Sequence, residues 1–189
     1  TLIHSDDTNM KILELIKENK SRDPKKERVG IFTTAMLSCF ENREIALFFT
    51  GRKHTGENIT ELFKKREEGL AAPLLMVDGA ARNIPDNLKA ILMNCLTHGR
   101  RQFIGLEEAF PEEIKYVIEL LADIYRYDAE AKKLKLNDGE RLKYHQERSA
   151  PCIAKLQVFC HDQIALKKTE PNSGLGRAIN YMEKRWEEL

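Results

Sequence analysis

The chain has 189 residues, of which 42% are hydrophobic, so it can bury a substantial core as one larger domain or as one domain with an insertion. Its formal net charge of +1 excludes a general excess of base, and a nucleic-acid partner would have to be held by local clusters of Lys and Arg. No apolar run approaches the roughly 20 residues that cross a membrane, and the start does not resemble a signal peptide. The four cysteines are scattered without a Cys-x-x-Cys pair, which indicates free thiols in a reducing compartment. These features predict a cytoplasmic protein without a membrane partner.

The first part of the chain has the pattern of strands. An apolar opening, Leu2-Ile3, leads into acidic residues, and segments rich in β-branched and aromatic residues follow at 29–34 and 45–50. The polar residues 41–44 between these two segments predict a hairpin turn, and Asp23-Pro24 predicts an earlier turn. We therefore expect three early strands that are antiparallel to one another.

Helices and strands then alternate. Residues 56–65 have the apolar spacing of an amphipathic helix, and 74–77 form a short apolar run that is typical of a buried strand. Residues 87–92 have a helix-like pattern, 93–96 are read as a short strand, and a further helix is expected to start at Thr97. The sequence thus predicts a mixed α/β sheet, with three antiparallel strands, then parallel strands, and helices that cover it.

From residue 111 onward the pattern is helical. Apolar residues recur at three- and four-residue spacing from Ile114 to Tyr125, and residues 137–139 break this helix. A second helical pattern runs to Pro151, which kinks the helix or restarts it, and Ser173 is a candidate N-cap of a last helix. We predict an α/β domain over residues 1–110 and an all-helical domain over 111–189.

Two acids are placed to act together. Asp78 follows the apolar run 74–77, and Asp6 stands in a similar place behind Leu2-Ile3, so that each would be delivered to an edge of the sheet. Carboxylate oxygens are the ligands that Mg²⁺ and Mn²⁺ prefer, which makes Asp6 and Asp78 candidate metal ligands. An acid after an apolar run is more often a helix or turn cap, and Asp7 competes with Asp6 for the role.

Two basic clusters are candidates for contact with a DNA backbone. Arg52 and Lys53 lie in a basic turn, while His98, Arg100 and Arg101 stand at the start of a predicted helix, where anions are favoured. The alternative is a solvated loop in the first case and a surface basic cluster with a packed histidine in the second.

Several motifs, in one order along almost the whole chain, resemble those of a known family. They are His4-Ser5-Asp6-Asp7-Thr8, Leu75-Met76-Val77-Asp78-Gly79, Cys95-Leu96-Thr97-His98-Gly99-Arg100-Arg101-Gln102-Phe103, and Tyr144 to Ser149 with Asn180-Tyr181 and Arg185-Trp186-Glu187. They resemble the transposases of the insertion-sequence-66 family, in which the first motif is usually His-Ala-Asp-Glu-Thr and the second ends Thr-Asp-Gly-Tyr. Here Asp7 replaces the usual Glu, and Ala80 replaces the aromatic residue after Asp-Gly.

The resemblance implies a ribonuclease-H-like catalytic core of the DDE type, interrupted by a helical insertion. The family's first two catalytic aspartates, which are also metal ligands, correspond to Asp6 and Asp78. Its third acid is a glutamate in an Asn-Asn-Ala-Ala-Glu-Arg type of motif, and this sequence contains no such motif. We therefore expect a central fragment of the enzyme with two of three acids, inactive in isolation.

The implied reaction is the cleavage and transfer of DNA strands with Mg²⁺ or Mn²⁺ as cofactor. In such reactions two ions about 3.5–4 Å apart stabilise the attacking and the leaving oxygens. The implied partner is double-stranded DNA, at the ends of the element and at the target, and self-association into a homo-oligomer is left open. The alternative function is a non-catalytic DNA- or protein-binding module from a decayed transposase.

Overall fold

The computed structural model describes residues 1–19, 28, 30–86 and 89–189, which form two compact units. The first unit comprises Thr1–Cys95 with Glu188–Leu189, and the second comprises Leu96–Glu187. These units reflect compactness alone, so the predicted division into a core over 1–110 and an insertion over 111–189 stays a prediction. Among the described residues, no helix combines the length and the apolar character needed to span a membrane.

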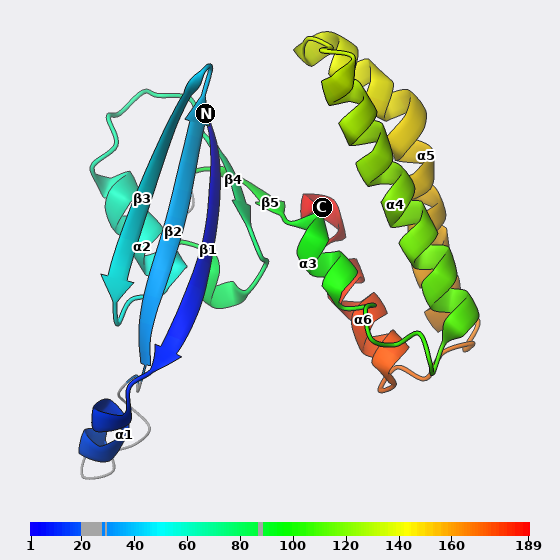
Figure 1. The fold of residues 1–189 in the computed structure, drawn as a ribbon, viewed down its shortest axis with the longest axis horizontal. Helices are drawn as coiled ribbons and strands as arrows, with labels where there is room; N and C mark the ends of the chain where they lie inside the picture. Colours follow the sequence, from blue (N-terminus) through cyan, green and yellow to red (C-terminus); the bar gives the residue numbers. More distant parts are fainter. Residues whose placement is uncertain (20–27, 29, 87–88) are drawn as a thin grey trace. The chain divides into compact units, whose positions relative to one another are not determined.

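A five-stranded sheet forms the centre of the first unit, in the order β3-β2-β1-β4-β5 (Figure 1). The strands are β1 (Leu2–Lys11), β2 (Gly30–Phe40), β3 (Arg43–Gly51), β4 (Leu74–Val77) and β5 (Ile91–Asn94). β2 pairs antiparallel with both β1 and β3, whereas β4 pairs parallel with both β1 and β5. The predicted mixed sheet of antiparallel and then parallel strands is therefore present.

The early strands are longer than the sequence pattern indicates. Prediction placed Asp6 behind the end of a short first strand, and this was wrong, because β1 continues through both acids to Lys11. Its backbone pairs with β2 over the whole of this length, with Asp6 opposite Ala35. Backbone pairing extends a strand through polar residues that lack a strand-like side-chain pattern. The predicted hairpin turn is confirmed, with a tight turn at Glu41 and Asn42.

The segment between β4 and β5 differs from its prediction. The helix expected over 87–92 is not formed in its described part, because Ile91 and Leu92 pair with Leu74 and Leu75 as the start of β5. Residues 87–88 lie outside the described residues, as does the turn predicted at Asp23-Pro24. A short 3-10 turn, η1 (Ala81–Asn83), follows β4 and was not predicted. A short helix after β1, α1 (Leu13–Asn19), was not predicted.

Helix α2 (Thr55–Lys64), predicted over 56–65, covers one face of the sheet (Figure 1). Its Ile59 is fully buried in a core cluster with residues of β1, β2 and β4, namely Ile3, Met36, Leu75 and Val77. Gly56 lets the first turn of α2 approach the chain after β4, since a Cβ at this position would lie 2.5 Å from the carbonyl oxygen of Ile84. The helix therefore packs on the sheet and also against the residues that follow Asp78.

The second unit consists of helices joined by turns, namely α3 (Leu96–Arg101), α4 (Pro111–Lys133), α5 (Asp138–Ala165) and α6 (Gly174–Glu183). The short turn η2 (Trp186–Glu188) follows α6, and its last residue belongs to the first unit. α4 and α5 lie side by side (Figure 1), and Val117 of α4 and Leu156 of α5 are fully buried. α5 runs through Pro151 without a break. The predicted N-cap is confirmed, since the hydroxyl of Ser173 accepts a hydrogen bond of 3.0 Å from the backbone N–H of Gly176.

Candidate metal centre

The register of the sheet brings Asp6 and Asp78 together. In the parallel pair of β1 and β4, His4 lies opposite Met76, so two further residues along each chain reach Asp6 and Asp78 at the same level. A carboxylate oxygen of Asp6 and one of Asp78 lie within 4.8 Å of each other. Two oxygens bound to one Mg²⁺ at about 2.1 Å can be up to about 4.2 Å apart, so at most a small side-chain rotation lets both carboxylates reach one ion.

Asp6 lies on the face of the sheet opposite α2. Successive residues of a strand point to opposite faces, and the neighbouring Ile3 and Ser5 are buried on the α2 side, whereas Asp6 is exposed. One oxygen of its carboxylate accepts a hydrogen bond of 2.8 Å from the backbone N–H of Asp7. Asp6 is therefore accessible to an ion from solvent while its side chain is tied to its own strand.

Asp78 is half-buried directly after the last residue of β4. Its Oδ1 accepts two hydrogen bonds, one of 2.8 Å from the backbone N–H of Ala80 and one of 3.0 Å from the side-chain amide of Asn83. Gly79 follows with a φ of 77°, in the left-handed region that favours glycine, and this turns the chain sharply after the acid. The two donors fix the orientation of the Asp78 carboxylate.

Asp7, the competing candidate, has a different environment from Asp6. Its side chain is only 4% exposed, with Oδ2 3.2 Å from Nδ1 of His54 and Oδ1 3.7 Å from the guanidinium of Arg82. His54 immediately precedes α2, and Arg82 belongs to η1. The carboxylate of Asp7 thus links three segments of the first unit on the α2 side of the sheet.

The predicted DNA-contacting residues are divided between the two units. Arg52 and Lys53 lie in the loop between β3 and α2 of the first unit, where Lys53 pairs with Glu61 of α2. His98, Arg100 and Arg101 belong to α3 of the second unit, and Nη1 of Arg101 lies 3.4 Å from Nε2 of His98. DNA contact by either group stays a prediction.

Sequence reasoning missed three residues that surround the acids, namely His54, Arg82 and Asn83. His54 was read as part of the basic turn that contains Arg52 and Lys53, and Arg82 and Asn83 were not singled out. Asn83 follows the Asp78-Gly79 pair by four residues, and such a pair indicates a turn but does not show which side chain bonds to the acid. The contacts of His54 and Arg82 with Asp7 join segments that are far apart in the sequence.

A comparison with known protein families matches the family described as Transposase IS66 family over residues 1–189. The chain belongs to the IS66 transposase family. No curated protein and no solved structure gives a significant match. As an IS66 family member the chain is part of a transposase of the DDE type, a class that binds DNA and typically uses divalent metal ions.

The residues of this IS66 family member fit such an ion by their chemistry. Both candidate ligands are carboxylates, which hard divalent cations prefer, and they come from adjacent parallel strands that fix their spacing. The carboxylate of Asp78 is also oriented by two hydrogen-bond donors.

Proposed function

We propose that this chain is the central part of a transposase that cleaves and transfers the DNA strands of an insertion sequence, with Asp6 and Asp78 as catalytic, metal-binding acids. The observation that carries the proposal is the approach of their carboxylate oxygens to within 4.8 Å, from adjacent parallel strands, in a member of the IS66 transposase family. The sheet order, with three antiparallel strands followed by two parallel ones, supports a ribonuclease-H-like core.

The proposed cofactor is Mg²⁺ or Mn²⁺, held by Asp6 and Asp78. When bound, such ions stabilise the negative charge that develops on the attacking and leaving oxygens of a phosphodiester. The contribution of the chain is to hold the two carboxylates in place. Paired strand backbones fix the position of Asp6, and two N–H donors fix the orientation of Asp78.

We further propose that residues 1–189 do not cleave DNA by themselves. A site of this type uses three acids, and the sequence contains no Asn-Asn-Ala-Ala-Glu-Arg type of motif to supply the third. The helical residues 111–189 would then form the insertion within the core. Arg52 and Lys53 in one unit, and His98, Arg100 and Arg101 in the other, are the proposed contacts to the DNA backbone.

Calorimetric titration with Mn²⁺ tests the proposed metal site. We expect the unchanged protein to bind Mn²⁺, and we expect Asp6→Asn and Asp78→Asn each to weaken this binding by about tenfold or more. Asp123→Asn, which removes a partly exposed acid on α4, is the matched control and should leave the affinity unchanged. If the unchanged protein binds no Mn²⁺, or if Asp78→Asn binds as well as the control, the metal-dependent proposal fails and the binding-module alternative is favoured.

A further inference from the structure

We propose that Asn83 is a positioning residue, whose side-chain amide holds the Asp78 carboxylate in the orientation that binds a divalent cation. This inference rests on the proposed function of Asp78. Asn83 would not touch the cation or the DNA, and it would act only through the carboxylate of Asp78.

The contacts of Asn83 are directional. Its Nδ2 donates a hydrogen bond of 3.0 Å to Oδ1 of Asp78, and the backbone N–H of Ala80 donates to the same oxygen at 2.8 Å. The two donors restrain rotation of the carboxylate about its side-chain bonds, so that Oδ1 stays turned toward the segment 80–83. The orientation of the other oxygen, Oδ2, is then set as well.

The burial of Asn83 is costly, which argues that its position is not incidental. The residue is 0% exposed, and its Oδ1 is a buried atom with no hydrogen-bond partner among the described residues. An unsatisfied buried polar atom destabilises the folded state, whereas an apolar residue of similar size would avoid this cost. The Nδ2 group of Asn83 donates to Asp78, while its Oδ1 has no partner among the described residues. The hydrogen bond to Asp78 is therefore the polar contact that this side chain makes.

The turn that carries Asn83 is itself anchored. The backbone N–H of Asn83 donates to the carbonyl of Ala80 at 2.8 Å, which closes η1. A Cβ on Gly56 of α2 would lie 2.7 Å from the carbonyl oxygen of Arg82, so η1 packs directly on the first turn of that helix. The guanidinium of Arg82 lies 3.7 Å from the Asp7 carboxylate of β1. The turn is thus held between α2 and the strand that carries Asp6, and it can fix one acid relative to the other.

The test compares Mn²⁺ affinity in Asn83→Ala with that in a matched variant, Asn58→Ala. Asn58 is also a buried amide of the first unit, 8% exposed, and its Nδ2 donates a hydrogen bond of 2.9 Å to the hydroxyl of Thr34. Both variants lose a buried amide hydrogen bond, so both should unfold at lower urea concentration. Partners that orient metal ligands typically change metal affinity by about 10–100-fold, and we expect a loss of this size in Asn83→Ala alone.

A second measurement uses the intact side chain and needs no metal. In the metal-free protein the side-chain amide protons of Asn83 should show the NMR shift and slow exchange of a hydrogen-bonded donor, and Asp78→Ala should abolish both. Unchanged Asn83 amide signals in Asp78→Ala would overturn the inference even if Asn83→Ala failed to fold.

The outcomes separate this inference from the proposed function. If the unchanged protein binds Mn²⁺ and Asp78→Asn does not, but Asn83→Ala binds with unchanged affinity, the positioning role of Asn83 is refuted and the metal site stands. If the unchanged protein binds no Mn²⁺ while the Asn83 amide is bonded to Asp78, the metal site itself is refuted, and with it the role inferred for Asn83.

Discussion

At the scale of single residues, the neighbours Asp6 and Asp7 show how one strand places two similar side chains in different environments. Asp6 points to the face of the sheet opposite α2, and Asp7 is 4% exposed on the α2 face, beside His54 and Arg82. Because alternate residues of a strand face opposite sides, the choice between them follows from the register of β1. The buried carboxylate of Asp7 stabilises the fold through its contacts with His54 and Arg82, whereas the exposed carboxylate of Asp6 is accessible to a ligand.

Asp7→Ala and Asp6→Ala should therefore have unequal effects on stability. We expect Asp7→Ala to lower the free energy of unfolding by about 1–3 kcal/mol, because it removes a buried acceptor from His54 and Arg82. Asp6→Ala should change it by no more than about 0.5 kcal/mol, since the side chain is exposed. Urea unfolding measures both values. Equal losses of stability, or a larger Mn²⁺ defect in Asp7→Ala than in Asp6→Ala, would contradict the division of roles.

The sequence predicted Asp78 better than it predicted the surroundings of that acid. The run Leu74–Val77 followed by Asp78 has a local signature, and the strand forms as expected. The hydrogen bond from Asn83 has no local signature, because its geometry depends on how η1 packs against Gly56 of α2. Side-chain contacts made by tertiary packing are beyond the reach of a pattern in one segment.

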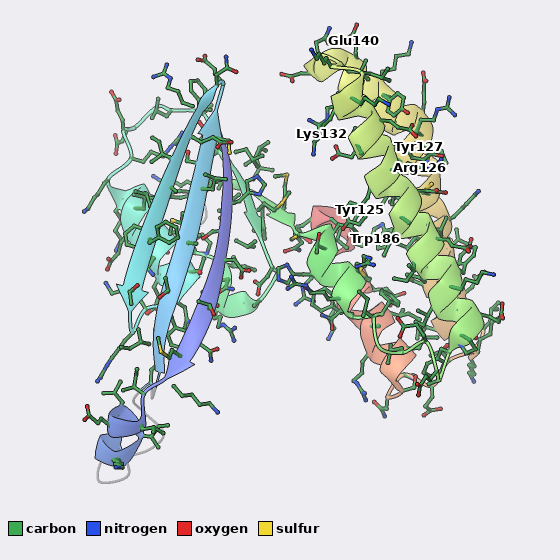
Figure 2. The ribbon with its side chains drawn as sticks, in the orientation of Figure 1. Tyr125, Arg126, Tyr127, Lys132, Glu140 and Trp186 are labelled. Atoms are coloured by element: carbon green, nitrogen blue, oxygen red, sulfur yellow. The ribbon has the colours of Figure 1, made fainter. Side chains whose placement is uncertain are left out.

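At the scale of elements, the pairing of α4 with α5 combines an apolar and a polar region. In the polar region the carboxylate of Asp128 pairs with Lys132 on α4, which Figure 2 labels, and with Arg141 on α5. Nearby, the Tyr144 hydroxyl of α5 donates a hydrogen bond of 2.6 Å to Glu130 of α4. These contacts join the two helices beyond the apolar stripe that the sequence predicted.

The Asp128 pairs predict a pH-dependent contribution to stability. Burial opposes the charged form, but the hydrogen bonds from Lys132 and Arg141 outweigh it and hold the pKa of Asp128 below its ordinary value of 3.8. A carboxylate with a lowered pKa stabilises the fold above its unfolded-state pKa, and this stabilisation is lost as the pH falls below about 3.8 toward the folded-state pKa. Since the groups are partly exposed, the contribution at neutral pH is about 1 kcal/mol or less.

Comparing the unfolding free energy of Asp128→Asn with that of the unchanged protein tests this contribution. The difference should be present at pH 7 and should shrink toward zero as the pH is lowered through and below 3.8. Asp123→Asn, in which an acid of a more exposed pair on α4 is removed, serves as the control. A difference for Asp128→Asn that does not change with pH would show that the ion pairs do not contribute in this way.

The elements themselves were predictable where their periodicity is strong. α2 and α4 follow clear amphipathic patterns. α2 starts one residue before its predicted start at 56, and α4 starts at residue 111, as predicted. The helix expected over 87–92 was wrong, since Ile91 and Leu92 join β5 by parallel pairing with β4. A short apolar segment has no decisive period of its own, and a neighbouring strand determines its conformation.

At the scale of the whole molecule, a nearly neutral chain has to bind DNA through local charge. The formal net charge is +1, so an excess of base over the whole chain cannot supply the affinity, and the clusters on α3 and before α2 are the proposed contacts. The family and the mixed sheet could both be predicted from the sequence, because the motifs and the strand patterns are local. The register that aligns Asp6 with Asp78 could not, since it is set by pairing between segments about 70 residues apart.

Salt dependence tests the proposed DNA contacts. We expect DNA affinity to fall with rising salt, and we expect Arg100→Ala combined with Arg101→Ala to reduce the slope of log affinity against log salt by up to about 1.8, or about 0.9 for each phosphate contact. Lys115→Ala on α4, which removes an exposed lysine, is the control and should leave the slope unchanged. An equal slope in the double variant and the unchanged protein would remove α3 from the proposed DNA interface.

The most direct test of the shared metal site is anomalous diffraction from crystals soaked in Mn²⁺. The proposed function predicts a peak at about 2.1 Å, the usual distance for a hard divalent cation, from carboxylate oxygens of both Asp6 and Asp78. It also predicts that the Asn83 amide remains bonded to Asp78 in the same crystals. A peak bound to Asp7 in place of Asp6, or no peak beside Asp78 at saturating Mn²⁺, would contradict the account.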